Sequence, residues 1–388
     1  MNRLKSYLPL SSAAFLLLFS CKNDLKLNAP YKEMPSIYAV INPNERVHII
    51  RVNKVFLGEG NANDMAKVAD SVNYPAGELT ITLDRYETGS RYTKQIEAAP
   101  ITHKKTITFR DSVIQTSSGA FSTTQRVYVF YDDLHEGPAP TTYPPPANSN
   151  WKVSGDYILT VKNNRTGNVF KAKSSIIDSV KLTGIKPFTY PFYPYNPGEL
   201  PERFIDYSDL GTSSSVRMNY NDAQLYQLVI RMHFKESAGG ADGYRFADYI
   251  SNNLDVTRDK RTFGNSSYLQ VDFINRDIFN AVGISMKNQG LTDQVASRKM
   301  YMIEFYVYTS TQDYADYLEF VKPSLSISQT KPLYSNFENR DALGIFTFRT
   351  RCMVRKEMAN SFINAFSDNP STCQYKFVTV DNEARGCK

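Results

Sequence analysis

The sequence predicts a mainly β protein of two domains, a β-sandwich followed by a second β-rich domain with a few short helices. Aromatic residues make up 13% of the 388 residues, with 26 Tyr and 23 Phe but a single Trp. Aromatic and β-branched residues are favoured in strands. Apolar and polar residues also alternate over many short stretches, which is the period of a strand. The chain exceeds the size at which one hydrophobic core stops growing, so we expect two domains.

Residues 1–20 are typical of a signal peptide. Basic residues precede an apolar run from Ala13 to Phe19, which is shorter than the roughly 20 residues that span a bilayer. The serine before Cys21 completes a pattern that resembles the lipobox of bacterial lipoproteins, whose cysteine is acylated. We therefore expect a lipid on Cys21 that attaches the chain to a membrane, with residues 21–35 as a tether to the first strand. An ordinary secretory signal with an incidental cysteine is the alternative.

Short strands fill the first domain, which we place at residues 36–185. Short strands at this spacing, with turn residues between them, predict a sandwich. Before the third strand, Asn63 or Asp64 is expected to cap a short helix that carries Met65 and Val68 on one side. The strand patterns cover residues 37–41, 47–56, 79–83, 91–96, 105–110, 126–131, 156–162 and 168–172.

Two proline clusters interrupt the strands. Residues 136–150 contain five prolines, which are excluded from a central ladder and favour polyproline II. We expect an exposed loop there, with a partner-binding segment as the alternative. Residues 186–201 mix proline with Phe and Tyr, and we place the domain boundary in them. They are interpreted as a connector whose rings pack against both domains, or else as stacking faces for a sugar or peptide.

The second domain, residues 202–388, combines long strands with two helices. Strand patterns cover residues 225–234 and 300–308, and the latter is apolar on both faces apart from Glu304, which predicts a central strand. Asn275 is expected to cap a helix that ends at Gly290. The apolar side of that helix consists of Ile278, Phe279, Val282 and Met286. A second helix is predicted over residues 311–322, with Tyr314, Tyr317, Leu318 and Val321 on one side.

The second helix begins a stretch that resembles the C-terminal signature of a large group of Bacteroidota outer-membrane lipoproteins of unknown function. In that signature an aromatic helix, here Tyr314–Phe320, is followed by a proline, by a Ser-Asn pair, here Ser335-Asn336, and by a Leu-Gly-Ile-Phe strand, here Leu343–Phe346. Residues 37–57 also resemble the first domain of this group. The chain departs from the group at residues 340–342, where relatives often carry glycine.

The resemblance implies an outer-membrane lipoprotein with an immunoglobulin-like N-terminal β-sandwich and a β-rich C-terminal domain, facing the cell surface or the periplasm. Members are often encoded beside TonB-dependent receptors and have no established catalytic activity. In physical terms the signature is structural. Gly344 is expected at a strand entry or a close backbone approach, and Asn336 is expected to form a turn or cap hydrogen bond.

A search for catalytic chemistry finds no established motif. The formal net charge is +6, and the basic residues are scattered rather than gathered as in a nucleic-acid binder. Nucleophile elbows, metalloprotease helices, P-loops and dinucleotide-binding loops are absent. We therefore predict no catalytic residue, no metal, no cofactor and no nucleic-acid partner. The neighbouring acids Asp132, Asp133 and Glu136 are interpreted as a solvated turn, and His48 and His233 as strand residues rather than ligands.

Three cysteines remain for disulfide chemistry if Cys21 carries lipid. All three lie near the C-terminus, and we expect one disulfide between Cys373 and Cys387, which leaves Cys352 as a free thiol.

Three Asp-Ser-Val triplets are candidate modification sites. Their serines are Ser71, Ser112 and Ser179, and the triplets resemble the acceptor at which Bacteroidota attach O-glycans to exported proteins. The alternative is that each triplet starts a strand, where polar residues give way to apolar ones.

Three functions remain open. The favoured one is a lipid-anchored, non-catalytic accessory or binding protein that works with a TonB-dependent or other outer-membrane barrel and uses its aromatic segments as the binding face. The second is a structural or adhesive envelope protein. The third is a hydrolase with an unrecognised site, which predicts clustered acids in one pocket of the second domain.

Overall fold

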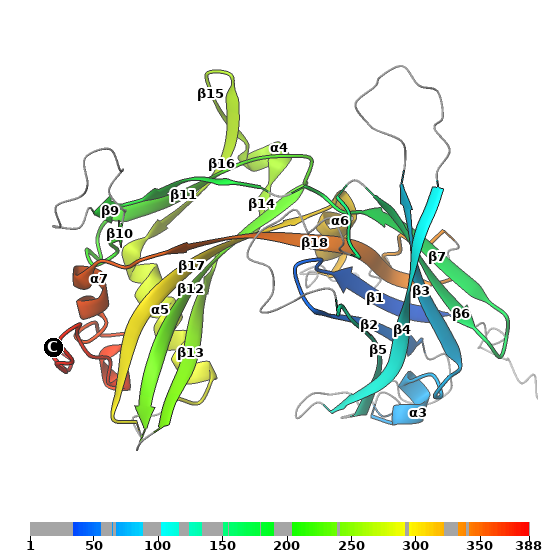
Figure 1. The fold of residues 1–388 in the computed structure, drawn as a ribbon, viewed down its shortest axis with the longest axis horizontal. Helices are drawn as coiled ribbons and strands as arrows, with labels where there is room; N and C mark the ends of the chain where they lie inside the picture. The colour runs from blue at the N-terminus through cyan, green and yellow to red at the C-terminus, as the bar shows by residue number, and fades with distance from the viewer. Residues whose placement is uncertain are drawn as a thin grey trace, which may run out of the picture.

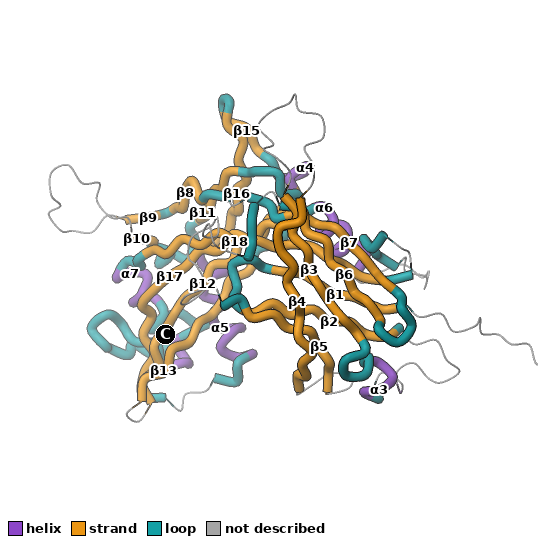
Figure 2. Tube along the Cα trace, turned by 45° about the vertical axis from the view of Figure 1, so that its right-hand side comes forward, coloured by secondary structure: helices purple, strands orange, loops and turns teal. Residues whose placement is uncertain are grey.

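The computed structural model describes residues 34–55, 64, 67–87, 102–115, 124–133, 150–153, 155–178, 180–189, 204–238, 241–291, 295–321, 333–338 and 341–387. It confirms the mainly β fold, with a sandwich-like arrangement of strands and a few short helices. Figure 1 shows two lobes that are joined by one long strand, β18 (Leu343–Lys356). Figure 2 shows how little of the described chain is helical.

The first lobe is built from the first seven strands. One continuous sheet runs in the order β18-β1-β2-β5-β4-β3-β6-β7. The predicted strands are confirmed wherever they fall on described residues, whereas the pattern at residues 91–96 lies outside them. The strands are β1 (Pro35–Ile41), β2 (Val47–Lys54), β3 (Leu79–Glu87), β4 (Thr102–Gln115), β5 (Thr124–Tyr131), β6 (Asp156–Asn163) and β7 (Val169–Ser175).

The sheet bends at β4, so that its two halves face each other as two layers. Its residues 102–109 pair with β3, and its residues 110–115 pair with β5. The two layers enclose a core that includes Ile50, Leu83 and Phe170. The edge strand β7 forms a bridge from Ala172 to Phe337, so a segment from the C-terminal part of the chain closes the lobe.

Asp132 corrects the sequence interpretation of its acidic neighbourhood. It was expected in a solvated turn, but it is fully buried. Its carboxylate accepts hydrogen bonds from Trp151 Nε1 at 2.9 Å and from the Asn150 amide. A buried carboxylate needs such donors, so Asp132 holds the single tryptophan in the core. Glu136 lies outside the described residues.

The second lobe contains part of the large sheet, a smaller four-stranded sheet, a two-stranded pair and several short helices. The large sheet continues past β18 through β17 (Ser297–Ser310) and β12 (Leu225–Ala238) to the edge strand β13 (Ala241–Ile250), with β14 (Leu254–Asp255) beside β12. As predicted, β17 is central, between β12 and β18. The smaller sheet has the order β15-β16-β11-β8, from β15 (Arg261–Phe263), β16 (Ser266–Ile274), β11 (Ser213–Asn219) and β8 (Leu182–Lys186). A two-stranded pair joins β9 (Phe188–Thr189) and β10 (Phe204–Ile205).

The helices match the predicted positions with one correction, at the start of α5. In α5 (Asn275–Asn288) the predicted apolar residues are buried, but Ile274 takes the N-cap position and Asn275 is the first helical residue. The buried Asn275 amide donates to the Asp209 carbonyl at 2.7 Å and accepts from the Ser214 hydroxyl, so it ties α5 to the smaller sheet. In the first lobe Asp64 is helical, Met65 lies outside the described residues, and a further short helix, α3 (Ala69–Val72), follows Val68. The remaining helices are α4 (Val256–Asp259), α6 (Gln312–Val321) and α7 (Asn360–Ala365).

The strand β18 belongs to both lobes. Residues 343–348 pair in parallel with β1, and residues 349–356 pair antiparallel with β17. Phe346 and Phe348 accordingly lie in the first core, whereas the second core resumes at Met358. Earlier in the chain, the buried residues of the first core run as far as Ile176, and those of the second core begin at Val180. The cores therefore differ from the expected domains 36–185 and 202–388, because the chain returns to the first lobe near its end.

Gly344 occupies the point at which β18 enters the sheet. Its φ angle is +110°, and a Cβ atom there would lie 1.9 Å from the carbonyl oxygen of Ile37. Asn336 forms the neighbouring contact, because its side-chain amide donates to the Phe346 carbonyl at 2.8 Å and accepts from the Phe346 N–H at 2.9 Å. The expectation for Gly344 is confirmed, because it permits a close backbone approach. The expectation for Asn336 is corrected: instead of a turn or cap hydrogen bond, its side chain forms a strand-like pair of bonds with the backbone of Phe346.

Replacing Gly344 is expected to weaken the junction between the lobes. Gly344→Ala should lower the free energy of unfolding by about 3 kcal/mol or more, because it combines a backbone clash with a strained φ. Gly77→Ala is the matched control, since Gly77 has a φ of +72° but nothing within 4 Å of the added Cβ. The control should cost about 1–2 kcal/mol. Urea unfolding measures both, and equal losses would contradict the close-approach argument.

The number of reactive thiols tests how the C-terminal cysteines are paired. Cys373 and Cys387 form a disulfide with a Cα–Cα distance of 5.0 Å, and Cys352 is a half-buried free thiol. The mature chain with Cys21→Ala should therefore show one reactive thiol when denatured and three after reduction. Cys387→Ser should cost about 2–3 kcal/mol, as expected for a cross-link that closes a short loop. Three thiols in the denatured, unreduced protein would refute the pairing.

Candidate binding groove

A groove lies where α6 meets β1 and β2, and we call it the α6 groove. It consists of two adjoining hollows of about 510 and 350 Å³, which share Ser36, Tyr38 and Tyr317 in their walls. In Figure 1, α6 sits above β1 and beside β18, near the junction of the two lobes. The groove is therefore built partly from the start of the fold and partly from the signature near its end.

One wall of the α6 groove is aromatic. Tyr317 stands 6.0 Å from Tyr38 and 5.8 Å from Tyr334, measured between ring centroids, and Phe320 stands 5.6 Å from Tyr334. The wall is open to solvent, since Tyr38 is 42% exposed and Leu333 is 71% exposed. From α6 the groove is lined by Tyr317 and Val321, two of the four residues predicted on its apolar side, and by Phe320. No α6 side chain is buried in a core. Exposed apolar groups gathered in one place mark interaction sites.

The aromatic wall is fixed by contacts to β18. The Thr311 hydroxyl, just before α6, lies 2.7 Å from the Thr347 hydroxyl, and the Tyr334 hydroxyl donates to Asp313 at 3.2 Å. The Gly344 N–H donates to the Tyr334 carbonyl at 2.9 Å. The strand entry that requires glycine therefore also positions Tyr334 in the groove.

The side of the groove formed by β2 is positively charged. Arg51 pairs with Tyr38 across the ladder, and Lys54 lines the same hollow. The Lys54 ammonium donates to the Asp70 carbonyl at 3.2 Å. Burial, followed by the neighbouring Tyr314 and Tyr317, raises the pKa of Tyr38 to about 12. Tyr38 consequently stays a neutral hydroxyl at physiological pH, able to donate and accept hydrogen bonds.

A second group of polar side chains lies on the open face of the large sheet of the second lobe. There Glu304 accepts hydrogen bonds from Tyr306 and from Arg355 at 2.5 and 2.9 Å, and pairs with His233 at 2.8 Å. Burial raises the pKa of Glu304, but the bonds from Tyr306, Arg355 and His233 outweigh it and lower the pKa overall. These contacts join β12, β17 and β18, so we assign this group to the stability of the sheet.

The predicted modification sites do not gather in one place. Ser71 lies in α3 and Ser112 in the middle of β4, both partly exposed, so neither starts a strand. The carboxylate of Asp111, beside Ser112, accepts from Arg126 at 2.6 Å and from the Gly77 N–H at 3.0 Å. Cys21 and Ser179 lie outside the described residues. Lipidation and O-glycosylation therefore stay predictions.

The histidines and acids form no metal site in the part of the chain that the structure describes. His48 is buried in β2, where its ring lies 4.7 Å from Trp151, and His233 lies in β12. Both are strand residues, as predicted. Among the same residues, no helix is long and apolar enough to span a membrane.

Sequence reasoning found one wall of the α6 groove and missed the other. The aromatic helix was recognised from its pattern, but Tyr38, Arg51 and Lys54 were passed over as ordinary strand residues. A usable signal existed at Tyr38, which alternates with the buried Ile37 and Ala39 and must therefore face outward. Nothing local indicated that this face lies beside α6.

Comparisons with known proteins do not assign the chain to a family. No protein-family model matches the chain, and no curated protein is similar to it.

The Glu304 contacts predict a pH-dependent contribution to stability. A carboxyl whose pKa is lowered by folding stabilises the protein above its unfolded pKa of about 4.3, and this contribution is lost as the pH falls through the folded pKa. Glu304→Gln should therefore lower the free energy of unfolding by about 1–3 kcal/mol at pH 7. The difference from the parent should shrink below about pH 4. A difference that is constant from pH 7 to pH 3 would contradict this account.

Proposed function

We propose that this chain is a lipid-anchored, non-catalytic binding protein of the bacterial outer membrane, and that it works with a TonB-dependent or other barrel protein. The α6 groove is its binding face, and an extended acidic segment of the barrel protein is the occupant. The observation that carries the proposal is the position of the groove, whose residues Ser36 and Tyr38 stand at the very start of the fold.

The short distance from the lipid attachment site supports a membrane partner. Met34, the first described residue, lies 13 residues after Cys21. An extended chain spans at most about 3.6 Å per residue, so the first described residue lies within about 47 Å of the lipid attachment site. A protein fixed in the same membrane stays within reach of the groove, and this raises its effective concentration there.

The chemistry of the two walls supports an acidic, extended segment. The rings of Tyr38 and Tyr317 offer flat apolar faces, and Arg51 and Lys54 add two positive charges on the other side. Aromatic anchors supply most of the affinity in protein interfaces, while charge complementarity steers encounter and selects the partner. A segment with apolar side chains along one edge and carboxylates along the other matches both walls.

The state of the acidic groups supports a non-catalytic role. The hydrolase alternative predicts clustered acids in one pocket of the second domain, and Asp259 and Asp272 do line one pocket there. Asp259 is paired with Arg258 at 2.8 Å and Asp272 with Arg261 at 3.2 Å. A hydrogen bond from Arg258 lowers the pKa of Asp259, whereas a general acid needs a raised pKa.

A pull-down tests the proposal directly. The native lipidated protein, extracted from outer membranes in mild detergent, should recover a barrel protein in stoichiometric amount, and Cys21→Ala should recover much less. Tyr317→Ala combined with Arg51→Glu should reduce recovery at least about 10-fold, since it removes an anchor and reverses a charge.

Two matched changes outside the groove serve as controls. Tyr244→Ala removes a ring that is 69% exposed on the other lobe, and Arg110→Glu reverses an exposed charge on β4. Both should leave recovery unchanged. Recovery of the lipoprotein alone, or equal losses in groove and control variants, would refute the proposal.

A further inference from the structure

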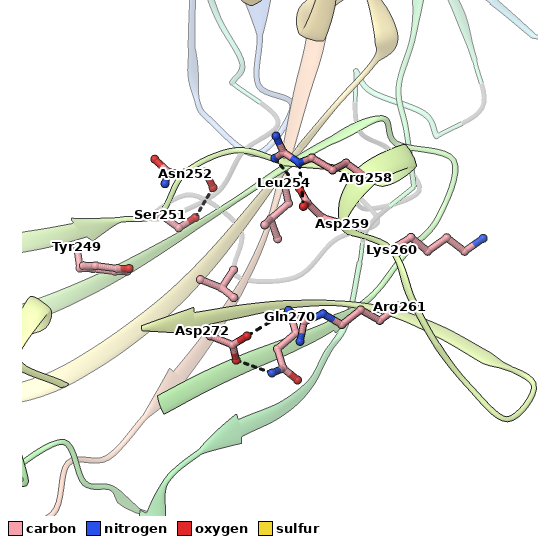
Figure 3. A pocket seen from close by; sticks show the side chains of 11 residues that line it. Tyr249, Ser251, Asn252, Leu254, Arg258, Asp259, Lys260, Arg261, Gln270 and Asp272 are labelled. Carbon is pink, nitrogen blue, oxygen red and sulfur yellow. Dashed lines mark hydrogen bonds and ion pairs between the residues drawn. The ribbon is translucent and has the colours of Figure 1, made fainter. Parts of the chain in front are cut away.

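A second hollow lies in the other lobe and is lined mainly by polar side chains. We call it the α4 pocket: it has a volume of about 370 Å³ and lies between α4 on one side and β15 and β16 on the other. This volume is within the range of small-molecule sites. Figure 3 shows Tyr249 of β13 at one end of the pocket and Lys260 and Arg261 toward the other.

Two ion pairs face each other across the α4 pocket. On the α4 side, Arg258 Nε and Nη2 donate to Asp259 at 3.0 and 2.8 Å. On the strand side, Arg261 Nη2 donates to Asp272 at 3.2 Å, and the Gln270 amide donates to the same carboxylate. Figure 3 shows both pairs as dashed contacts on opposite walls.

The two ion pairs leave some donors and acceptors available to a ligand, but the pocket carries little net charge. Each guanidinium carries five N–H donors and each carboxylate about four acceptor positions, so both pairs keep unused donors and acceptors. The remaining cation, Lys260, donates to the Tyr220 hydroxyl at 2.5 Å. The lining therefore keeps one net positive charge, from three cations and two carboxylates, and offers an anion little attraction. Hydroxyl groups, which donate and accept, fit donors and acceptors arranged side by side.

The pocket also has an apolar component and a fixed frame. The Tyr249 ring is held 5.3 Å from the Phe273 ring, measured between ring centroids. Leu254 and Val271 are the aliphatic residues in the lining of the pocket. The α4 wall is anchored by Asp255, whose carboxylate accepts from the Thr257 N–H at 2.7 Å and from the Gln224 amide at 3.0 Å. A preformed site binds without the cost of ordering its walls.

We propose that the α4 pocket is a binding site for a neutral sugar. The two ion pairs and Gln270 bind the hydroxyl groups, and the Tyr249 ring contacts the C–H face of the sugar ring. The site is separate from the α6 groove and does not depend on the function proposed for that groove.

Calorimetric titration of the mature chain carrying Cys21→Ala tests this inference. The probes are glucose, galactose, mannose and N-acetylglucosamine, with inorganic phosphate as the anionic comparison. At least one sugar should bind saturably, and phosphate should not bind. Arg258→Ala and Asp272→Ala, which alter side chains that are 71% and 46% exposed, should each weaken sugar binding at least about 10-fold.

The control removes an ion pair elsewhere. Asp156→Ala breaks the pair with Lys173, at 2.9 Å in the first lobe, and should leave sugar binding unchanged. Unaltered thermal midpoints for the two pocket variants show that a loss of binding is local. The inference is overturned if none of the four sugars binds, if both pocket variants bind as the parent does, or if phosphate binds in place of the sugars.

Discussion

The close approach between Gly344 and Ile37 is the contact on which the rest of the structure depends. It admits β18 beside β1, and the same strand then continues into the second lobe to pair with β17. A side chain at residue 344 would push the two backbones apart, and the strand could no longer pair in both lobes. Asn336 completes this junction through its paired bonds to Phe346. The signature near the C-terminus is therefore a joint between the two lobes.

The joint also creates the α6 groove. Because β18 lies beside β1, the aromatic helix that precedes it in the chain is brought over the first strand, where Tyr317 meets Tyr38. The groove thus needs both ends of the fold, and loosening the joint should disturb the groove before it disturbs either core. The α4 pocket depends on different contacts, those of Asp255 and the smaller sheet, so the two surfaces are structurally independent.

The sequence predicted the elements whose signals are local and missed the relations that are not. Alternation identified β1 and helical spacing identified α5, because burial on one face leaves a period in the chain, and an apolar run on both faces identified the central β17. The return of β18 to the first lobe has no such signature: Arg351 bonds to Asn44 across 307 residues. The burial of Asp132 was missed for the same reason, since its donor Trp151 follows a proline-rich segment. The α4 pocket joins residues whose charges look like an ordinary solvated run.

The most direct test of the central claim is photo-crosslinking from the groove in intact cells, with the lipidated protein carrying benzoylphenylalanine at residue 317 and, separately, at residue 244. The account predicts a crosslinked product with one outer-membrane protein from residue 317 and none from residue 244. Absence of a product at 317, or the same product from both positions, would contradict the assignment of the α6 groove as the partner-binding face.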